Sequence, residues 1–407
     1  MDNPLRKGVA GMSADTEAGC GKSESWRYGD AGFAIDAGFP GGNIVVERVD
    51  GDEVFVRQDL RDTGRFWFYW CFRVRGARGR RLKFNFTGGR VIGVRGPAVS
   101  LDGGDTWAWL GSDGEDFESF EYDFAEDEVT FSFGMPYLES HWARFREEVA
   151  GHPLFSSRRL CTTREGREAE YALVGRPGFE PRHRIALGCR HHCCEMMASY
   201  ALEGLLRWVL LDPGGEAAWL REHAGFFALP FADKDGVERG DQGKGRMPRD
   251  HGRDYQGESI YPAPAAVREL LPEWGGGRLR VVLDLHCPGM YGDYNEVIYL
   301  VGSSSEDIAR EQRRFSDALV AVRTGPLPFD ADDYLPFGTA WNKGANYSDG
   351  RGFSRWAGDE IPGVRLASAL EIPYANAGGA EVNQESAGLF GRDLGAALAG
   401  YLKSLAG

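Results

Sequence analysis

The chain has 407 residues, a formal net charge of -14 and 42% hydrophobic residues. A chain of this length favours two domains over one, and its hydrophobic fraction is sufficient to fill two cores. The negative charge argues against nucleic acid and anionic membranes as partners.

Neither secretion nor membrane insertion is indicated by the sequence. Residues Met1 to Ser25 lack the apolar core of a signal peptide, and no segment approaches the roughly 20 apolar residues of a membrane span. Seven cysteines without regular spacing fit free thiols in a reducing compartment better than a disulfide framework. We therefore expect a cytoplasmic protein.

Short segments rich in aromatic and β-branched residues extend from Asn43 to about Phe133, separated by Gly-Gly, Asp-Gly and Gly-Pro. This pattern predicts an antiparallel β-sandwich. We assign residues 1–152 to it as an N-terminal domain. Within it, the run from Phe66 to Arg75 alternates only partly, as expected of a strand that is buried on both faces.

The pattern changes after about His152 to short apolar runs separated by helical patterns, which predicts an α/β domain over residues 153–407. Ser305 is expected to cap one of its helices. The polar motifs fall at strand ends and in loops, where open α/β sheets bind their ligands. We expect buried strands at residues 184–188, 225–231 and 280–285, and helices at residues 195–211, 305–322 and 386–405.

His192 and Glu195 form a His-x-x-Glu motif where a predicted strand turns into a predicted helix. This spacing at such a turn can bring an imidazole and a carboxylate onto one ion. A catalytic zinc ion needs three protein ligands and a fourth position for water. His286 is the natural third ligand, because it ends the apolar run of a strand expected to lie nearby.

Two other interpretations of these residues remain open from the residues alone. A single His-x-x-Glu can arise by chance in a chain with 61 acidic residues, which would make His192 an ordinary buried histidine. A thiolate metal site is the other, although no Cys-x-x-Cys pair with structural-zinc spacing is present. The cysteines that crowd around the two histidines are Cys189, Cys193, Cys194 and Cys287.

Four motifs follow one another in a specific order: CRHHCCE (189–195), LPFADKDGVERGDQGKGRMPRDHGRDY (229–255), LDLHC (283–287) and LEIPYA (370–375). This order resembles the zinc metallocarboxypeptidase family, and within it the cytosolic carboxypeptidase-like branch. The aromatic segments SLDGGDTWAWL and MPYLESHW also look like the β-sandwich domain of that branch. The resemblance implies a catalytic domain with a mixed central sheet flanked by helices.

The resemblance also implies roles for individual residues. His192, Glu195 and His286 become the ligands of one Zn²⁺. Asp250 matches the aspartate that hydrogen-bonds the first histidine ligand and fixes its orientation. Arg253 matches the arginine that pairs with the terminal carboxylate of the substrate, a task suited to a bidentate guanidinium.

Further catalytic roles follow from the same resemblance. Glu371 matches the general base, and a carboxylate in an otherwise apolar segment is consistent with a functional role. The family has a cation that stabilises the oxyanion in the loop before Asp250. Lys244 and Arg246 both lie in that loop, and we slightly favour Arg246. Tyr347 is a candidate for the tyrosine that closes over the substrate in the digestive branch.

The chain departs from the family pattern at two places. Cys193 and Cys194 replace the Pro-Gly of the first motif, where neither residue is a ligand. Gly252 stands where the family has an asparagine beside the carboxylate-binding arginine. The loss of that amide removes a donor to the terminal carboxylate, which costs about 0.5–3 kcal/mol.

The resemblance implies hydrolysis of the C-terminal peptide bond of peptides or protein tails, with a preference for acidic terminal residues as in the cytosolic branch. Lys343, Arg351 and Arg355 lie in a loop that could supply a cation for this preference. Gly252 keeps open a zinc-dependent amide hydrolase, such as an N-acyl amino-acid deacylase. The third alternative is a non-catalytic binding protein with a vestigial zinc site.

Overall fold

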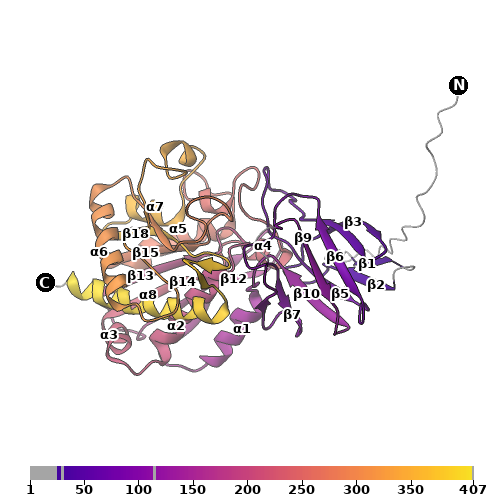
Figure 1. Cartoon of the computed structure of the whole chain (residues 1–407). Helices are drawn as coiled ribbons and strands as arrows, with labels where there is room; N and C mark the ends of the chain where they lie inside the picture. Colours follow the sequence, from indigo (N-terminus) through magenta and orange to yellow (C-terminus); the bar gives the residue numbers. More distant parts are fainter. Residues whose placement is uncertain (1–24, 29–31, 113–115, 406–407) are drawn as a thin grey trace.

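The computed structural model describes residues 25–28, 32–112 and 116–405, which form two packed parts that follow one another along the chain (Figure 1). The N-terminal part contains two sheets. The six-stranded sheet has the order β1-β2-β5-β10-β7-β8, formed by Ser25–Tyr28, Phe33–Asp36, Cys71–Arg75, Glu128–Ser132, Ala98–Ser100 and Ala108–Trp109. The four-stranded sheet has the order β3-β4-β6-β9, formed by Val45–Asp50, Glu53–Arg57, Arg81–Phe86 and Ser119–Asp123.

Aromatic side chains fill the space between these two sheets. Phe72 of β5 packs on Phe84 of β6 with ring centroids 5.2 Å apart, and Phe131 of β10 packs on Phe120 of β9 at the same distance. The prediction of an antiparallel sandwich is wrong at one pair, because β4 and β6 run parallel. The chain passes through β5 in the opposite sheet between these two strands, and so re-enters the second sheet in the same direction.

The C-terminal part is built on an eight-stranded mixed sheet of order β11-β12-β14-β13-β15-β18-β16-β17. Its strands are Phe155–Thr162, Glu168–Val174, Ala224–Leu229, His183–Cys189, Leu279–His286, Leu366–Glu371, Tyr299–Val301 and Tyr334–Leu335. The helices of the chain are α1 Glu139–Glu148, α2 Met197–Leu211, α3 Gly215–His223, α4 Lys234–Arg239, α5 Pro262–Gly275, α6 Glu306–Val322, α7 Phe353–Glu360 and α8 Gln384–Ser404. The expected mixed sheet with flanking helices is therefore confirmed.

Alternating side chains of the central strand β15 point to opposite faces of the sheet. Val281, Leu283 and Leu285 belong to the core that also contains the buried faces of α2 and α8. Val282 belongs to a second core that contains buried residues of α5 and α7. Helices thus cover both faces of the sheet (Figure 1), and this accounts for strands that are apolar along their whole length.

Several helix boundaries differ by one or two residues from those expected. The α6 helix starts after Ser305, whose hydroxyl accepts a hydrogen bond from the backbone N–H of Ile308 as predicted. The α8 helix starts at Gln384, two residues before the expected start, because Asn383 caps it by accepting from the backbone N–H of Ser386.

Strands β13, β15 and β18 are parallel neighbours in the sheet, so their carboxyl ends meet at one edge. His286 ends β15 and lies opposite Glu371, which ends β18. His192 follows the end of β13 by three residues. The topology therefore brings together residues separated by up to about 180 positions in the sequence.

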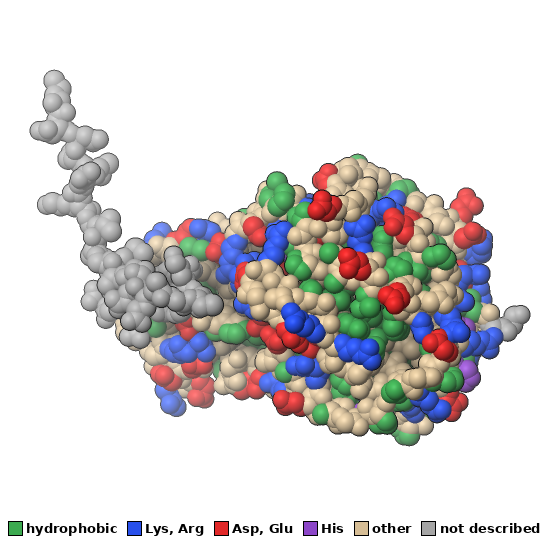
Figure 2. Space-filling view, turned by 180° about the vertical axis from the view of Figure 1, so that it is seen from behind, with side chains coloured by type: hydrophobic (Ala, Val, Ile, Leu, Met, Phe, Trp, Pro, Cys, Tyr) green, Lys and Arg blue, Asp and Glu red, His purple; other side chains and the backbone are tan. Residues whose placement is uncertain are grey.

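The surface seen from behind carries Lys and Arg interspersed with Asp and Glu (Figure 2). Among the residues that the structure describes, no helix is both long and apolar enough to cross a membrane.

Candidate functional site

His192, Glu195 and His286 form a buried cluster of potential metal ligands. The Nδ1 atom of His192 lies 2.8 Å from one carboxylate oxygen of Glu195, and Nδ1 of His286 lies 2.6 Å from the other. The two imidazole rings are 5.0 Å apart. Two imidazoles and one carboxylate that converge in this way match the donor set of a catalytic zinc site, so these residues fit Zn²⁺.

The far nitrogens of both histidines face carboxylates. Nε2 of His286 lies 2.9 Å from Asp284, and Nε2 of His192 lies 3.6 Å from Asp250. Burial alone would raise the pKa of both aspartates, but the neighbouring histidines outweigh it and hold these pKa values well below the usual range. Each carboxylate therefore directs the Nδ1 atom of its histidine toward the centre of the cluster.

Asp284 also belongs to a chain of hydrogen bonds that the sequence did not lead us to expect. Its other oxygen lies 2.7 Å from Nδ1 of His191, and Nε2 of His191 lies 2.8 Å from the hydroxyl of Tyr255. The His191 side chain is fully buried and packs on Phe353. A sequence signal for Asp284 does exist, because it lies two residues before His286 and so on the same side of the strand.

The carboxylate of Glu371 faces this cluster from the neighbouring strand. Glu371 is buried, and its Oε2 atom has no hydrogen-bond partner among the residues that the structure describes. Burial is the main reason that its pKa is raised to about 7; Glu195 also raises this pKa, whereas His286 and Lys244 lower it. A carboxylate with this pKa can exchange a proton near neutral pH.

The two candidate cations of the loop before Asp250 occupy different environments. The ammonium group of Lys244 lies 3.4 Å from Nε2 of His192 and lines the same pocket as Glu371. Arg246 points away and does not line that pocket. Its buried guanidinium pairs with three carboxylates, those of Asp62, Asp233 and Asp241, at 2.6–2.7 Å.

The loop that carries Lys244 is bound by the N-terminal part of the chain. The Gln242 side chain accepts from the backbone N–H of Tyr69 at 2.8 Å and donates to the Tyr69 carbonyl at 2.8 Å. The backbone N–H of Met247 donates to the carbonyl of Asp62, and that of Gly64 donates to the carbonyl of Gly245. The backbone of the N-terminal part therefore holds the loop that carries Lys244 in place.

Arg253 and Tyr347 line the pocket beside the cluster. The Arg253 guanidinium donates to the carbonyls of Gly252 and Asn346 and lies 5.3 Å from the ring centroid of Tyr347. The Tyr347 hydroxyl donates to Asn342 at 2.7 Å. Two N–H groups of Arg253 are thus used to hold its guanidinium, and the others remain for a ligand.

Gly252 approaches His192 closely. A β-carbon at position 252 would lie 2.8 Å from Nε2 of His192 and 3.3 Å from a carboxylate oxygen of Asp250. Glycine is therefore the residue that fits here without displacing His192 or Asp250. The departure from the asparagine of the family pattern has a steric reason in this chain.

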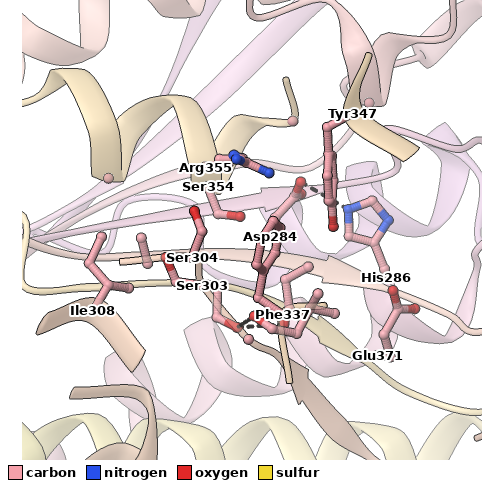
Figure 3. A pocket seen from close by; sticks show the side chains of 18 of the residues that line it. Asp284, His286, Ser303, Ser304, Ile308, Phe337, Tyr347, Ser354, Arg355 and Glu371 are labelled. Atoms are coloured by element: carbon pink, nitrogen blue, oxygen red, sulfur yellow. Dashed lines mark hydrogen bonds and ion pairs between the residues drawn. The ribbon is translucent and has the colours of Figure 1, made fainter. Parts of the chain in front are cut away.

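The pocket extends from the cluster into a recess with mainly small side chains (Figure 3). In this view His286 and Glu371 lie on one side, and Ser303, Ser304 and Ile308 on the other. Of the three cations considered for terminal-residue recognition, only Arg355 lines the recess. Arg351 instead pairs with Asp359 and Glu360 on α7, and Lys343 is not among the lining residues.

The cysteines near the site are not among the side chains that converge as potential metal ligands. Within the described part of the chain, the two groups that could hold a metal contain only histidine, aspartate and glutamate. Burial raises the pKa of Cys189 and Cys194 to about 12. All cysteines among the described residues are free.

Solved structures of metallo-carboxypeptidases share this architecture. The enzyme from Burkholderia cenocepacia superposes with a TM-score of 0.74 and 22% identity, over 92% of this chain and 99% of that chain. The enzyme from Pseudomonas aeruginosa, in complex with (2-guanidinoethylmercapto)succinic acid, gives 0.71 and 21%, over 91% and 99%. The chain therefore has the fold of these metallo-carboxypeptidases through both of its parts, which confirms at the level of the fold the resemblance drawn from the motifs.

Sequence comparison does not assign the chain to a family. No protein-family model matches the chain. An uncharacterized protein of Zymomonas mobilis is 26% identical over 218 residues, which cover 51% of this chain and 55% of that protein. The match thus spans about half the length of this curated relative.

Proposed function

We propose that the protein is a zinc-dependent metallocarboxypeptidase that removes the C-terminal residue from peptides or protein tails. The observation that carries this proposal is the position of Glu371. Its buried, unpaired carboxylate lies opposite His286 in adjacent strands and faces the His192–Glu195–His286 cluster. A general base beside a two-histidine, one-carboxylate site is the arrangement that metal-assisted amide hydrolysis requires.

Zn²⁺ held by His192, Glu195 and His286 would supply a Lewis acid that lowers the pKa of water and polarises the scissile carbonyl. Glu371 accepts the proton of the attacking water and passes it to the nitrogen of the leaving residue. The protonatable carboxylate with a pKa of about 7 suits both transfers. Lys244 faces the carbonyl oxygen on which negative charge develops.

Arg253 serves as the anchor for the terminal carboxylate of the substrate. Its guanidinium is already held by two backbone carbonyls and by the ring of Tyr347, so little rotational freedom is lost on binding. An anchor for a free carboxylate limits cleavage to the last peptide bond. Tyr347 forms one wall of the same pocket and covers the bound residue.

For the side chain of the terminal residue, we assign an acidic preference to Arg355. The other lining residues of the recess are mainly small or uncharged, and Asp359 lies 4.0 Å from the Arg355 guanidinium. Asp359 also pairs with Arg351 at 3.4 Å, so its single negative charge is shared between two arginines. Terminal glutamate should therefore be released faster than terminal glutamine. Arg355→Gln should remove that difference, whereas the matched Arg351→Gln, outside the recess, should retain it.

The experiment that tests the function compares three peptides of one sequence. The first has two free ends, the second is amidated at its C-terminus, and the third is acylated at its N-terminus. We expect zinc-dependent release of the last residue from the two peptides with a free C-terminus only, and loss of release with a chelator. Equal hydrolysis of the amidated peptide would favour an amide hydrolase of another substrate class. Stoichiometric zinc with no hydrolysis of any peptide would instead favour a binding protein.

A further inference from the structure

A second cavity, of about 340 Å³, lies at the amino-terminal ends of the strands whose carboxyl ends form the metal site. Arg182 precedes β13, Arg280 lies near the start of β15, and Arg365 precedes β18. Strand β15 has eight residues, so the two sites are separated by about 20 Å or more of sheet. The lining residues are Arg182, His183, Arg280, Arg314, Arg365, Ser404 and Leu405.

The charge of this cavity is strongly positive. Four of its lining residues are arginines, and no acidic side chain lines it among the residues that the structure describes. Glu311 is buried and does not line the cavity; it pairs with Arg314 at 2.9 Å and accepts from the Tyr401 hydroxyl at 2.7 Å. One carboxylate leaves most of the positive charge uncompensated.

A buried histidine in this cavity lacks hydrogen-bond partners. His183 is 4% exposed, and neither of its ring nitrogens has a partner in the described ranges. A buried polar group without a partner is costly, and such groups in native proteins are normally satisfied. Burial, followed by Arg182 and Arg280, lowers the pKa of His183 to about 4. The imidazole is therefore neutral and offers one N–H donor to an acceptor in the cavity.

The arginines divide into two that are fixed and two that are free. Arg280 donates to the carbonyls of Gly277 and Gly363, and Arg314 donates to the hydroxyl of Ser404. Arg182 forms no hydrogen bond or ion pair with any described residue, and Arg365 approaches only Glu311, at 3.9 Å. The fixed pair shapes the cavity, and the free pair retains its donors for a ligand.

We propose that this cavity binds the polyphosphate group of a small molecule. Several guanidinium groups around one cavity match a multivalent anion with many acceptor oxygens, which they bind in bidentate fashion. A ligand with a single carboxylate would leave most of the positive charge of the arginines unmatched. The volume falls in the range of small-ligand pockets. Ser404 and Leu405 complete the lining of the cavity.

Isothermal titration of the zinc-loaded protein with tripolyphosphate and with ATP tests this site and separates an inorganic from a nucleotide ligand. We expect binding of at least one probe, and binding at least about tenfold weaker in the Arg182→Gln/Arg365→Gln variant. His183→Leu should also weaken binding. Arg313→Gln is the control for the loss of one arginine charge, because Arg313 lies on α6 and does not line the cavity; it is compared with Arg365→Gln alone.

The active site also contains cations, so Arg253→Gln is measured in parallel. This variant should bind the probe like the wild type. The proposal is overturned if neither probe binds, if the double variant binds as tightly as the wild type, or if Arg253→Gln abolishes binding. Thermal unfolding of each variant shows whether it is folded. If the double variant does not fold, Arg365→Gln alone replaces it.

Discussion

Gly252 and His192 are in such close contact that a methyl group on the glycine would lie 2.8 Å from Nε2 of the histidine. Gly252→Ala should therefore displace His192 or its partner Asp250. We expect zinc affinity to fall about tenfold or more, the usual effect of disturbing the partner of a metal ligand. Competition with a fluorescent chelator measures it.

Gly344→Ala provides the matched control for this prediction. Gly344 lies three residues before Tyr347, which lines the pocket, and a β-carbon at Gly344 would meet no atom within 4 Å. Its zinc affinity should equal that of the wild type. Unchanged affinity in Gly252→Ala would show that the close contact relaxes without cost.

The Glu371 carboxylate should contribute to the pH dependence of stability in the metal-free protein. Its pKa is raised to about 7 in the folded state and is ordinarily 4.5, so the folded state binds the proton more tightly. The unfavourable effect on stability is absent below pH 4.5, grows as the pH rises toward 7, and is complete above it. Glu371→Gln should therefore stabilise the chelator-treated protein at pH 8 by about 3 kcal/mol. Urea unfolding at pH 4.5 and pH 8 measures this; a larger gain at pH 4.5 than at pH 8 would contradict it.

The same substitution should retain zinc and lose peptide hydrolysis, because glutamine has no proton-accepting carboxylate. Metal analysis and a release assay on one preparation measure both properties. An active Glu371→Gln enzyme would falsify the assignment of Glu371 as the base.

Lys244 and Arg246 should respond differently to substitution. Lys244→Gln should lower kcat about 10²- to 10³-fold with little change in unfolding, since the lost cation faces the reacting carbonyl. Arg246→Gln should destabilise the fold by about 3–5 kcal/mol, because it leaves buried carboxylates without their partner. Comparing kcat with the free energy of unfolding for both variants tests the assignment. The reverse pattern would return the oxyanion role to Arg246.

Asp284→Asn should weaken zinc binding about 10- to 100-fold, because the amide no longer accepts the His286 N–H as a charged partner. Asp293→Asn serves as its control, since Asp293 lies exposed in the loop that follows the same strand. Zinc affinities of the two variants give the comparison, and equal values would argue that Asp284 does not orient His286.

The sequence predicts the α/β strands and helices well because their apolar periodicity reflects burial directly. Prediction from the sequence fails where the backbone forms hydrogen bonds with side chains and not with a neighbouring strand. The expected strand at Phe66 to Arg75 begins only at Cys71, because Gln58 binds the carbonyl of Trp67 and Gln242 binds the backbone of Tyr69. No local pattern contains those long-range amide contacts.

Long-range contacts also limit what the sequence can predict about the site. The order of the motifs was enough to select His192, Glu195, His286 and Glu371, which the structure brings together. It could not separate Lys244 from Arg246, since the direction of each side chain depends on carboxylates such as Asp62 that come from the other part of the chain. The parallel β4–β6 pair was missed for a similar reason, because it depends on which sheet receives β5.

The loop that carries Lys244 is held by Tyr69, Asp62 and Gly64 of the N-terminal part. A fragment cut near residue 152 would keep every proposed zinc ligand and the proposed base, yet the loop that carries Lys244 would lose its contacts with the N-terminal part. The unit needed for the proposed activity is therefore larger than the segment that contains the candidate catalytic residues. Grafting the C-terminal half into another protein would transfer the metal site without its full reactivity.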